Sequence, residues 1–262
     1  MKKNRELRAQ AREALAGQWG INVGVLFVSF LLSGMIIGVF SGLTDFSVGS
    51  LQDNILQFLI TNLFTFAFTY ATYYIALQVI RGERAQIKQI FTIFDNQLYF
   101  PIFAINLVNS LVTYLIGLLV FLPILITAGL GVYLSFVLGG DGGSAGLSNY
   151  LVAGNFVFIG SLLVISLIAT FVISIFTGIF QFAAWSKMDF PELTVFQSIK
   201  EGWRLFKGRI IQYLLLHLSF IGWYILGGMA LMIGLFWVVV YNNTSIAAFY
   251  DEARKDIGGP VV

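Results

Sequence analysis

The residues of this chain that could carry out chemistry are few, and cysteine is absent. Residues 142–146, Gly-Gly-Ser-Ala-Gly, match the G-x-S-x-G pattern of a nucleophile elbow, in which a turn between a strand and a helix exposes a serine for acyl transfer. Here the pattern lies in a glycine-rich loop, without the flanking strand and helix that the elbow requires. A flexible linker is therefore a better interpretation than a catalytic serine.

His217 is the single histidine, and it lies in an apolar stretch. An ionisable residue inside a membrane-spanning segment is a functional-site candidate by default. Ser219 is close by, but the stretch has no acid, and a metal site would need ligands that the sequence does not supply. We favour a neutral imidazole that hydrogen-bonds to a neighbouring helix over a proton relay, and we expect no metal and no other cofactor. An intramembrane hydrolase built on His217 or Asp251 is a remote alternative.

Small neutral polar residues recur at helical spacing in three apolar stretches. They either hold helices together by interhelical hydrogen bonds, at roughly 0.6 kcal/mol each, or line a path for a neutral polar solute or lipid headgroup. Packing is the commoner case. Since the predicted spans contain no acid, proton-driven transport is not expected. The residues are Thr61, Thr65, Thr69 and Thr72; Asn106, Asn109, Ser110 and Thr113; and Ser166, Thr170, Ser174 and Thr177.

The composition identifies the class of structure that must position these residues. Of the 262 residues, 58% are hydrophobic and 11% are charged, and the mean hydropathy is +0.86, far from the values of soluble domains. The apolar runs are continuous rather than alternating, and they reach the roughly 20 residues that a helix needs to cross a bilayer. The sequence predicts an all-α, polytopic helical membrane protein.

Six spans are predicted, and the basic residues orient them. Every lysine and arginine falls in the first 20 residues, in two later loops or in the C-terminal tail, whereas the other connections carry only aspartates. By the positive-inside rule, both termini are cytoplasmic. The apolar stretch 123–138 is short for a span, and we interpret it as a proline-kinked continuation of the third helix or a re-entrant piece. The predicted spans are residues 21–43, 55–80, 99–122, 155–184, 210 to about 228, and about 229 to 250.

Each of the three cytoplasmic segments has apolar residues at helical spacing just before an outward-going span. Lys200, Arg204 and Lys207 occupy the other side of the third segment, whose apolar side includes Trp203. Such helices are predicted to lie in the membrane interface, with basic faces toward anionic headgroups. The apolar residues are Leu7, Ala11, Leu15 and Trp19; Ile87, Ile90, Phe91, Phe94 and Leu98; and Leu193, Phe196, Ile199, Trp203 and Phe206.

The chain thus reads as one integral membrane domain, residues 1–262, with a repeated layout. Three units are one interpretation, each an amphipathic helix followed by an out-and-back helical hairpin. The alternative is that any protein of helical hairpins needs basic inner loops. The parts are an N-terminal amphipathic helix at 1–20 that we expect to be retained, a transmembrane bundle at 21–250 with amphipathic segments near 86–98 and 191–208, and a tail at 251–262.

Two further motifs concern helix packing and the last span. Gly34, Gly38 and Gly42 form a G-x-x-x-G-x-x-x-G face, which permits close helix approach within the protein or between copies. Asn242 and Asn243 interrupt the last apolar run, and the predicted topology puts them near the inner leaflet, where glycosylation is not expected. We predict that they bond to neighbouring helices or to the third amphipathic segment. A role in solute binding at the inner mouth is the alternative.

Three stretches resemble a family catalogued as domain of unknown function 975, which comprises bacterial integral-membrane proteins. They are NRELRAQAREALAGQWG near the start, SIKEGWRLFKGRIIQYLLLHLSFIGWYILGG, and GLFWVVVYNNTSIAAFY. The likeness covers the start and the last third of the chain, and the insert at 139–155 departs from the shorter members expected. The layout is also similar to the membrane domain of some glycerophosphodiester phosphodiesterases. The resemblance implies a helical membrane fold and a plasma-membrane location, mostly in Gram-positive bacteria, and it implies no activity.

The sequence therefore favours a non-enzymatic, multi-pass protein of the bacterial plasma membrane that assists an envelope process. Its expected partners are membrane lipids, anionic at the cytoplasmic leaflet, and a membrane protein or a second copy of the chain, with no nucleic acid. A passive transporter or lipid-handling protein for a neutral polar solute or lipid headgroup is the alternative.

Overall fold

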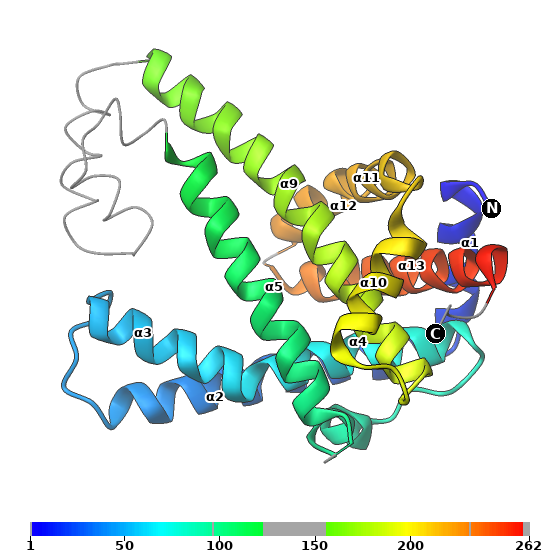
Figure 1. The fold of residues 1–262 in the computed structure, drawn as a ribbon, viewed down its shortest axis with the longest axis horizontal. Helices are drawn as coiled ribbons and strands as arrows, with labels where there is room; N and C mark the ends of the chain where they lie inside the picture. The colour runs from blue at the N-terminus through cyan, green and yellow to red at the C-terminus, as the bar shows by residue number, and fades with distance from the viewer. Residues whose placement is uncertain (1, 96, 123–155, 231, 259–262) are drawn as a thin grey trace. The chain divides into compact units, whose positions relative to one another are not determined.

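The computed structural model describes residues 2–95, 97–122, 156–230 and 232–258, and all regular elements in these ranges are helical (Figure 1). They are α1 (Asn4–Leu15), α2 (Trp19–Gly42), α3 (Leu51–Ile60), the π-helical turn η1 (Thr61–Thr65), α4 (Phe66–Ile80), the 3₁₀ helix η2 (Ile87–Phe94), α5 (Tyr99–Val120), α9 (Phe156–Asp189), α10 (Val195–Phe206), α11 (Ile210–Leu218), α12 (Ile221–Met229) and α13 (Ile233–Ile257).

Within the described residues, six helical segments are long and apolar enough to cross a membrane. They correspond one to one to the six predicted spans, so the prediction of a polytopic helical membrane protein is confirmed. The stretch 123–138, the Gly-Gly-Ser-Ala-Gly pattern at 142–146 and the insert at 139–155 lie outside the described residues. The segments are Trp19–Gly42, Leu51–Ile80, Tyr99–Val120, Leu163–Asp189, Ile210–Met229 and Ile233–Ile257.

The fifth span differs from the continuous helix that was predicted, because it is interrupted between α11 and α12. At the interruption the hydroxyl of Ser219 donates to the carbonyl of Leu216 at 2.6 Å, and the amide of Phe220 donates to the carbonyl of His217 at 2.9 Å. These bonds to residues three positions back replace the α-helical ladder. Phe220 is fully buried, with its ring centroid 4.9 Å from that of Tyr241, and this packing holds the turn.

The last helix continues well past the predicted end at residue 250. α13 runs to Ile257, and the amide of Gly258 closes it by donating to the carbonyl of Arg254 at 2.9 Å. Gly258 has φ +85°, a backbone conformation that glycine adopts far more readily than other residues. The extra two turns carry Asp251, Arg254 and Lys255, so the helix projects a charged end beyond its apolar part.

The chain divides into two compact units. Unit 1 comprises Met1–Gly34, Thr65–Asn106 and Gly178–Val262, and unit 2 comprises Met35–Phe64 and Leu107–Thr177. All 15 lysines and arginines of the sequence belong to unit 1, whereas the charged residues of unit 2 are three aspartates. The charge asymmetry seen along the sequence is therefore also an asymmetry between the two units.

The core of unit 1 is an aromatic cluster in which the ring of Phe182 is central. Its centroid lies 5.3 Å from that of Tyr250, 5.4 Å from that of Phe206 and 5.8 Å from that of Trp185. The four side chains are fully buried and come from α9, α10 and α13. Burial of large aromatic side chains is the strongest contribution to packing that this part of the chain offers.

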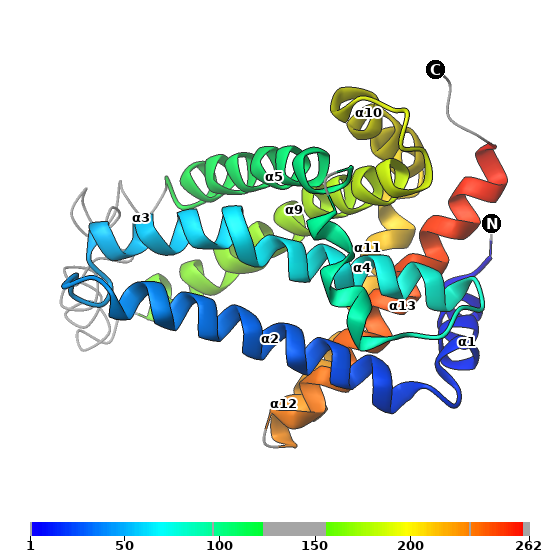
Figure 2. The same ribbon diagram turned by 90° about the horizontal axis from the view of Figure 1, so that it is seen from below.

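α1 lies against the C-terminal half of α13 and also contacts α4 and α11 (Figure 2). Leu7, Ala11 and Leu15 are spaced along one face of α1 and are fully buried by these contacts. The start of α1 and the C-terminal end of α13 consequently lie on the same side of unit 1 (Figure 1), where Lys2 and Glu252 form an ion pair at 3.6 Å.

Unit 2 is held by pairs of residues on neighbouring helices. The hydroxyl of Ser110 on α5 donates to the side-chain oxygen of Asn62 in η1 at 2.6 Å. The rings of Phe58 and Tyr114 meet edge to face at 5.3 Å, which joins α3 to α5. A buried asparagine in this π-helical turn therefore serves as a helix-packing residue.

Candidate functional site

The strongest candidate site is the surface of α10, which connects the end of α9 to the start of α11. A capping box begins the helix: the amide of Gln197 donates to the Thr194 hydroxyl at 3.2 Å, and the Thr194 amide donates to the Gln197 side chain at 2.8 Å. Gly202 then lies against the backbone of α9. A Cβ atom at this position would lie 2.6 Å from the carbonyl oxygen of Ile179, so only glycine fits there.

Close packing at Gly202 determines which face of α10 is buried. Ser198, Leu205 and Phe206 are fully buried on the side that faces the protein, and Gly202 is buried beside them. The prediction had placed Phe196 and Trp203 on an apolar side opposite the basic residues, and this is wrong for the arrangement observed.

The opposite face of α10 is exposed and combines aromatic rings with lysines. Phe196 is 76% exposed and Trp203 is 44% exposed, and both are far from the buried face. Lys200 and Lys207 lie on the same face at helical spacing, and both are exposed without a partner among the described residues. Phe196, Lys200, Trp203 and Lys207 are called the α10 face below.

Arg204 does not belong to the α10 face. Its guanidinium forms an ion pair with Glu201 at 2.7 Å and donates to the carbonyl of Gly258 at 3.5 Å. Of the four interfacial residues predicted on this segment, three therefore share the exposed face, and Arg204 links α10 to the end of α13.

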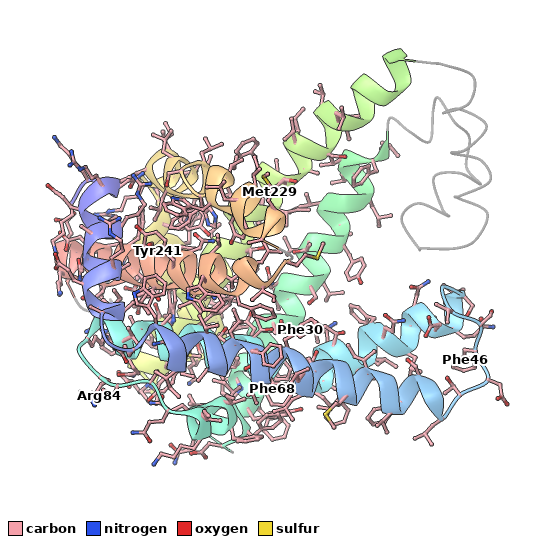
Figure 3. The ribbon with its side chains drawn as sticks, turned by 180° about the vertical axis from the view of Figure 1, so that it is seen from behind. Phe30, Phe46, Phe68, Arg84, Met229 and Tyr241 are labelled. Atoms are coloured by element: carbon pink, nitrogen blue, oxygen red, sulfur yellow. The ribbon has the colours of Figure 1, made fainter. Side chains whose placement is uncertain are left out.

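The helix η2 presents a second exposed face of the same character. Ile90 and Ile93 are fully buried, and the rings of Phe91 and Phe94 pack near Phe68 of α4. Phe91 is nevertheless 56% exposed, and Lys88 beside it is exposed. Figure 3 labels Phe68, which belongs to α4, the helix against which η2 packs.

The N-terminal helix α1 differs from these two segments, because its apolar face is buried within the protein. Arg12 donates to the hydroxyl of Tyr241 at 2.7 Å, and that hydroxyl donates to the carbonyl of Arg8 at 3.3 Å. Trp19 also meets the Tyr241 ring edge to face at 6.0 Å. Figure 3 shows Tyr241 on α13 beside α1. The apolar residues of α1, which were predicted to lie in the membrane interface, thus pack against other helices of the protein.

Beside α10, an ion network joins the C-terminal ends of α4, α9 and α13. Asp189 accepts two hydrogen bonds from Arg81, at 2.7 and 2.8 Å, one from the hydroxyl of Tyr250 at 3.0 Å, and one from Arg254. Asp251 pairs with Arg81 at 3.4 Å. The hydrogen bonds to Asp189 raise the pKa of Arg81 further above its ordinary value, so this guanidinium stays charged at every physiological pH.

Lys187 holds the turn between α9 and α10. Its side chain is buried, and the ammonium donates to the carbonyls of Pro191 at 2.6 Å and Leu193 at 2.5 Å. A cation at the C-terminus of a helix also interacts favourably with the helix dipole. The orientation of α10 therefore depends on Lys187 at its entry and on Gly202 at its centre.

The family described as Protein of unknown function (DUF975) matches residues 1–256. The chain belongs to this family. No match was found among curated proteins or among solved structures. The resemblance carried by the start and the last third of the sequence is thus confirmed over nearly the whole length.

In this DUF975 protein, His217 does not lie in a cluster of chemical groups. Its ring centroid is 4.5 Å from that of Tyr213, and its Nε2 atom is buried without a partner among the described residues. The same residues contain no group of three histidines or acids that could hold a metal ion. The predicted hydrogen bond to a neighbouring helix is not formed from Nε2.

The polar stripe of the second span does not follow one face. Thr65 is 5% exposed, whereas Thr61 and Thr69 are exposed. The π-helical turn η1 explains this, because a turn with more residues than an α turn breaks the spacing on which the prediction relied. On α5, Asn106 is buried, and the Oδ1 atom of Asn109 is buried without a partner among the described residues.

On α9 the polar residues also fail to form one buried line. Thr170 is exposed and returns its hydroxyl to the carbonyl of Ser166 at 2.8 Å. The hydroxyl of Ser174 is buried without a partner among the described residues. The hydroxyls of Thr170 and Ser174 therefore lie in different environments.

The remaining predicted residues lie on α2 and α13. Gly34, Gly38 and Gly42 are exposed, and a Cβ atom at any of them would meet no described residue within 4 Å, so this face does not pack closely against the part of the chain that the structure describes. Asn242 is buried and donates to the hydroxyl of Tyr224 on α12 at 3.0 Å, as predicted for a bond to a neighbouring helix. Asn243 lines a small cavity between α2, α4 and α13.

Proposed function

We propose that this DUF975 protein is a non-enzymatic, multi-pass protein of the bacterial plasma membrane that assists an envelope process by binding lipids or partner proteins at its cytoplasmic surface. The observation that carries the proposal is the α10 face, on which the exposed rings of Phe196 and Trp203 alternate with two lysines that have no partner among the described residues. We assign both termini and α10 to the cytoplasmic side, in agreement with the positive-inside rule.

The position of α10 supports binding at the membrane interface. It follows the end of one predicted span, α9, and precedes the next, which begins at Ile210. Aromatic rings prefer the level of the headgroups, and lysines reach the phosphates from there. Each lysine near an anionic surface contributes about 1 kcal/mol of attraction. The α10 face is therefore better suited to contact with anionic lipid than to exposure to the cytosol.

The exposed part of η2 supports the same proposal. Phe91 and Lys88 repeat the combination of an exposed ring and an exposed lysine, and η2 also connects two predicted spans. In this proposal α10 and η2 both lie at the cytoplasmic membrane interface. Together they would bind anionic headgroups, or a partner protein, at the cytoplasmic end of the bundle.

The proposal gives the one histidine a packing role. The His217 ring lies 4.5 Å from the Tyr213 ring, centroid to centroid, and its Nε2 atom is buried without a partner among the described residues. The transport alternative has less support, because Thr61 and Thr69 are exposed while Thr65 is buried, so they do not form a shared lining.

Lipid retention tests the proposal. The protein would be reconstituted in nanodiscs of mixed phosphatidylglycerol and phosphatidylcholine, extracted gently, and analysed by native mass spectrometry for bound lipid and protein. Lys200→Gln with Lys207→Gln should lower the retained phosphatidylglycerol several-fold. Lys3→Gln with Arg5→Gln, which removes the same charge from the exposed side of α1, serves as the matched control.

The outcomes separate the two kinds of partner. Loss of phosphatidylglycerol in the α10 variant alone supports lipid binding, and loss of a stoichiometric co-purified protein supports partner binding. Equal retention of both by wild type, α10 variant and control would show that the α10 face binds neither.

A further inference from the structure

The sequence of η2 repeats every three residues, which is the period of a 3₁₀ helix. The helix spans eight residues, whereas 3₁₀ helices seldom exceed three or four. Because such a helix has three residues per turn, residues three positions apart form a straight edge along it. One edge contains Ile90 and Ile93, which are fully buried, and η2 packs against α4. The other two edges are turned outward.

The two outward edges line a groove on the surface of unit 1. One edge is aromatic and starts with a lysine, and the other is polar and ends with a carboxylate. The groove has a volume of about 500 Å³ and is open to the surface. It is called the η2 groove below. Its lining consists of Lys88, Phe91 and Phe94 on the first edge and Gln89, Thr92 and Asp95 on the second.

The η2 groove has a cation at one end and an anion at the other. Lys88 and Asp95 are exposed, and neither forms an ion pair within the described residues. At the rise of a 3₁₀ helix, their Cα atoms are about 14 Å apart along the axis. The flexible lysine side chain can cover part of that distance. The remainder leaves room for a ligand that carries both signs of charge.

The polar groups along the groove follow the same order as the charges. The side-chain oxygen of Gln89 already accepts from a backbone amide at 2.8 Å, so its amide nitrogen is the group left to donate. The hydroxyl of Thr92 has no partner among the described residues. The carboxylate of Asp95 accepts from the backbone amide two residues on at 3.3 Å and has further lone pairs. Donors thus lie toward Lys88, which suits a phosphate, and the acceptor lies at the other end, which suits an ammonium.

The aromatic edge connects the groove to the surface of a predicted span. The ring of Phe94 stacks on that of Tyr99 at 6.1 Å, and the Tyr99 ring meets that of Phe100 at 5.4 Å. Both residues begin the span Tyr99–Val120, and Phe100 is 68% exposed. A lipid could therefore place its acyl chains along the span and its headgroup in the groove. An open groove suits such a ligand better than a free solute, because solute sites enclose most of the ligand.

We infer that the η2 groove binds the headgroup of phosphatidylethanolamine, with its phosphate at Lys88 and its ammonium at Asp95. A primary ammonium donates charge-assisted hydrogen bonds to a carboxylate, whereas the quaternary ammonium of phosphatidylcholine has no N–H to donate. Phosphatidylglycerol carries no cation, and Asp95 repels its phosphate. The inference rests on the proposed function in placing η2 at the cytoplasmic interface, and it adds a lipid whose charge differs from that assigned to the α10 face.

Competition between lipids tests the inference. The full-length protein would be reconstituted in nanodiscs with equal amounts of phosphatidylethanolamine, phosphatidylcholine and phosphatidylglycerol, extracted gently, and analysed by native mass spectrometry. Wild type should retain phosphatidylethanolamine several-fold over phosphatidylcholine. Asp95→Asn should abolish this preference, because it removes the charge and keeps the oxygen that holds the following turn. Glu83→Gln, which removes an exposed carboxylate outside the groove, is the matched control and should keep the preference.

A second variant keeps the test decisive if Asp95→Asn does not fold. Lys88→Gln changes an exposed residue at the other end of the groove and should lower the retained phosphatidylethanolamine several-fold. Arg84→Gln, which removes an exposed cation from the loop before η2, is its control and should have no such effect (Figure 3). Equal retention of phosphatidylethanolamine by wild type, Asp95→Asn and Lys88→Gln would overturn the inference.

Other occupants of the groove would give different results. If Asp95→Asn raises the retained phosphatidylglycerol and leaves phosphatidylethanolamine unchanged, the groove binds an anionic lipid and the inference is overturned. Loss of a stoichiometric co-purified protein in Asp95→Asn, with phosphatidylethanolamine unchanged, would identify a protein in the groove and also overturn it. Lys200→Gln with Lys207→Gln should leave the preference for phosphatidylethanolamine intact. Failure at the α10 face can thus be told apart from failure at the η2 groove.

Discussion

Arg81 donates two hydrogen bonds to the carboxylate of Asp189, at 2.7 and 2.8 Å, and so joins residues 108 positions apart in the sequence. Arg81 follows α4 and Asp189 ends α9, so the pair fastens the ends of two predicted spans. Tyr250 donates to the same carboxylate from α13 at 3.0 Å. One aspartate thus ties together the second helix of each predicted hairpin.

Asp189→Asn should destabilise unit 1 by about 2 kcal/mol, because Arg81 and Arg254 would lose their shared carboxylate while remaining partly buried. Breaking a fully buried pair costs more, but the arginine side chains are 26% and 32% exposed, and solvent screens them. Thermal unfolding in nanodiscs measures the change. Asp256→Asn, which breaks the exposed pair with Arg209, should have a much smaller effect.

Gly202→Ala should displace α10 from α9. The added methyl group would lie 2.6 Å from the carbonyl oxygen of Ile179 and 2.7 Å from the amide nitrogen of Ala183, and backbone atoms cannot move aside easily. A loss of about 2–3 kcal/mol is expected. Gly222→Ala is the matched control, because a Cβ atom there meets no described residue within 4 Å, and alanine favours a helix. Similar Tm values for both variants would refute the close contact.

Lys187→Met should loosen the turn that leads into α10. The substitution keeps the apolar part of the side chain and removes the donor that two backbone carbonyls share, so a loss of about 2–3 kcal/mol is expected. Lys200→Met, on the exposed face, should leave Tm nearly unchanged. Phosphatidylglycerol retention should also fall in Lys187→Met if the position of α10 matters for lipid binding.

Labelling of single cysteines tests the orientation, and the absence of natural cysteine gives a clean background. A membrane-impermeant maleimide should label Ser47→Cys in intact cells, because Ser47 is exposed in the connection between the first two spans. Glu83→Cys, exposed in the next connection, should be labelled only after the cells are permeabilised. The reverse pattern would place both termini outside.

The contacts of α10 show where prediction from sequence stops. Its helical nature, its lysines and its apolar residues were all predicted, yet the face that it buries was not. Which face of α10 is buried depends on Gly202, because its lack of a side chain lets the backbone of α9 approach closely. The sequence of the segment alone does not show that α9 packs against this glycine. The π-helical turn at Thr61–Thr65 and the interruption at Ser219 are decided in the same way, by packing against residues elsewhere in the chain.

By itself, the sequence determined the class of protein, the six spans and the separation of charge between alternate connections. These follow from local quantities, because the thickness of the hydrocarbon core sets the length of an apolar run and basic residues are excluded from that core. Only the tertiary structure decided which residues meet. Asp189 with Arg81 and Tyr250, and Asn22 with Asn243 around one cavity, come together across long stretches of chain, because packing brings distant helices into contact.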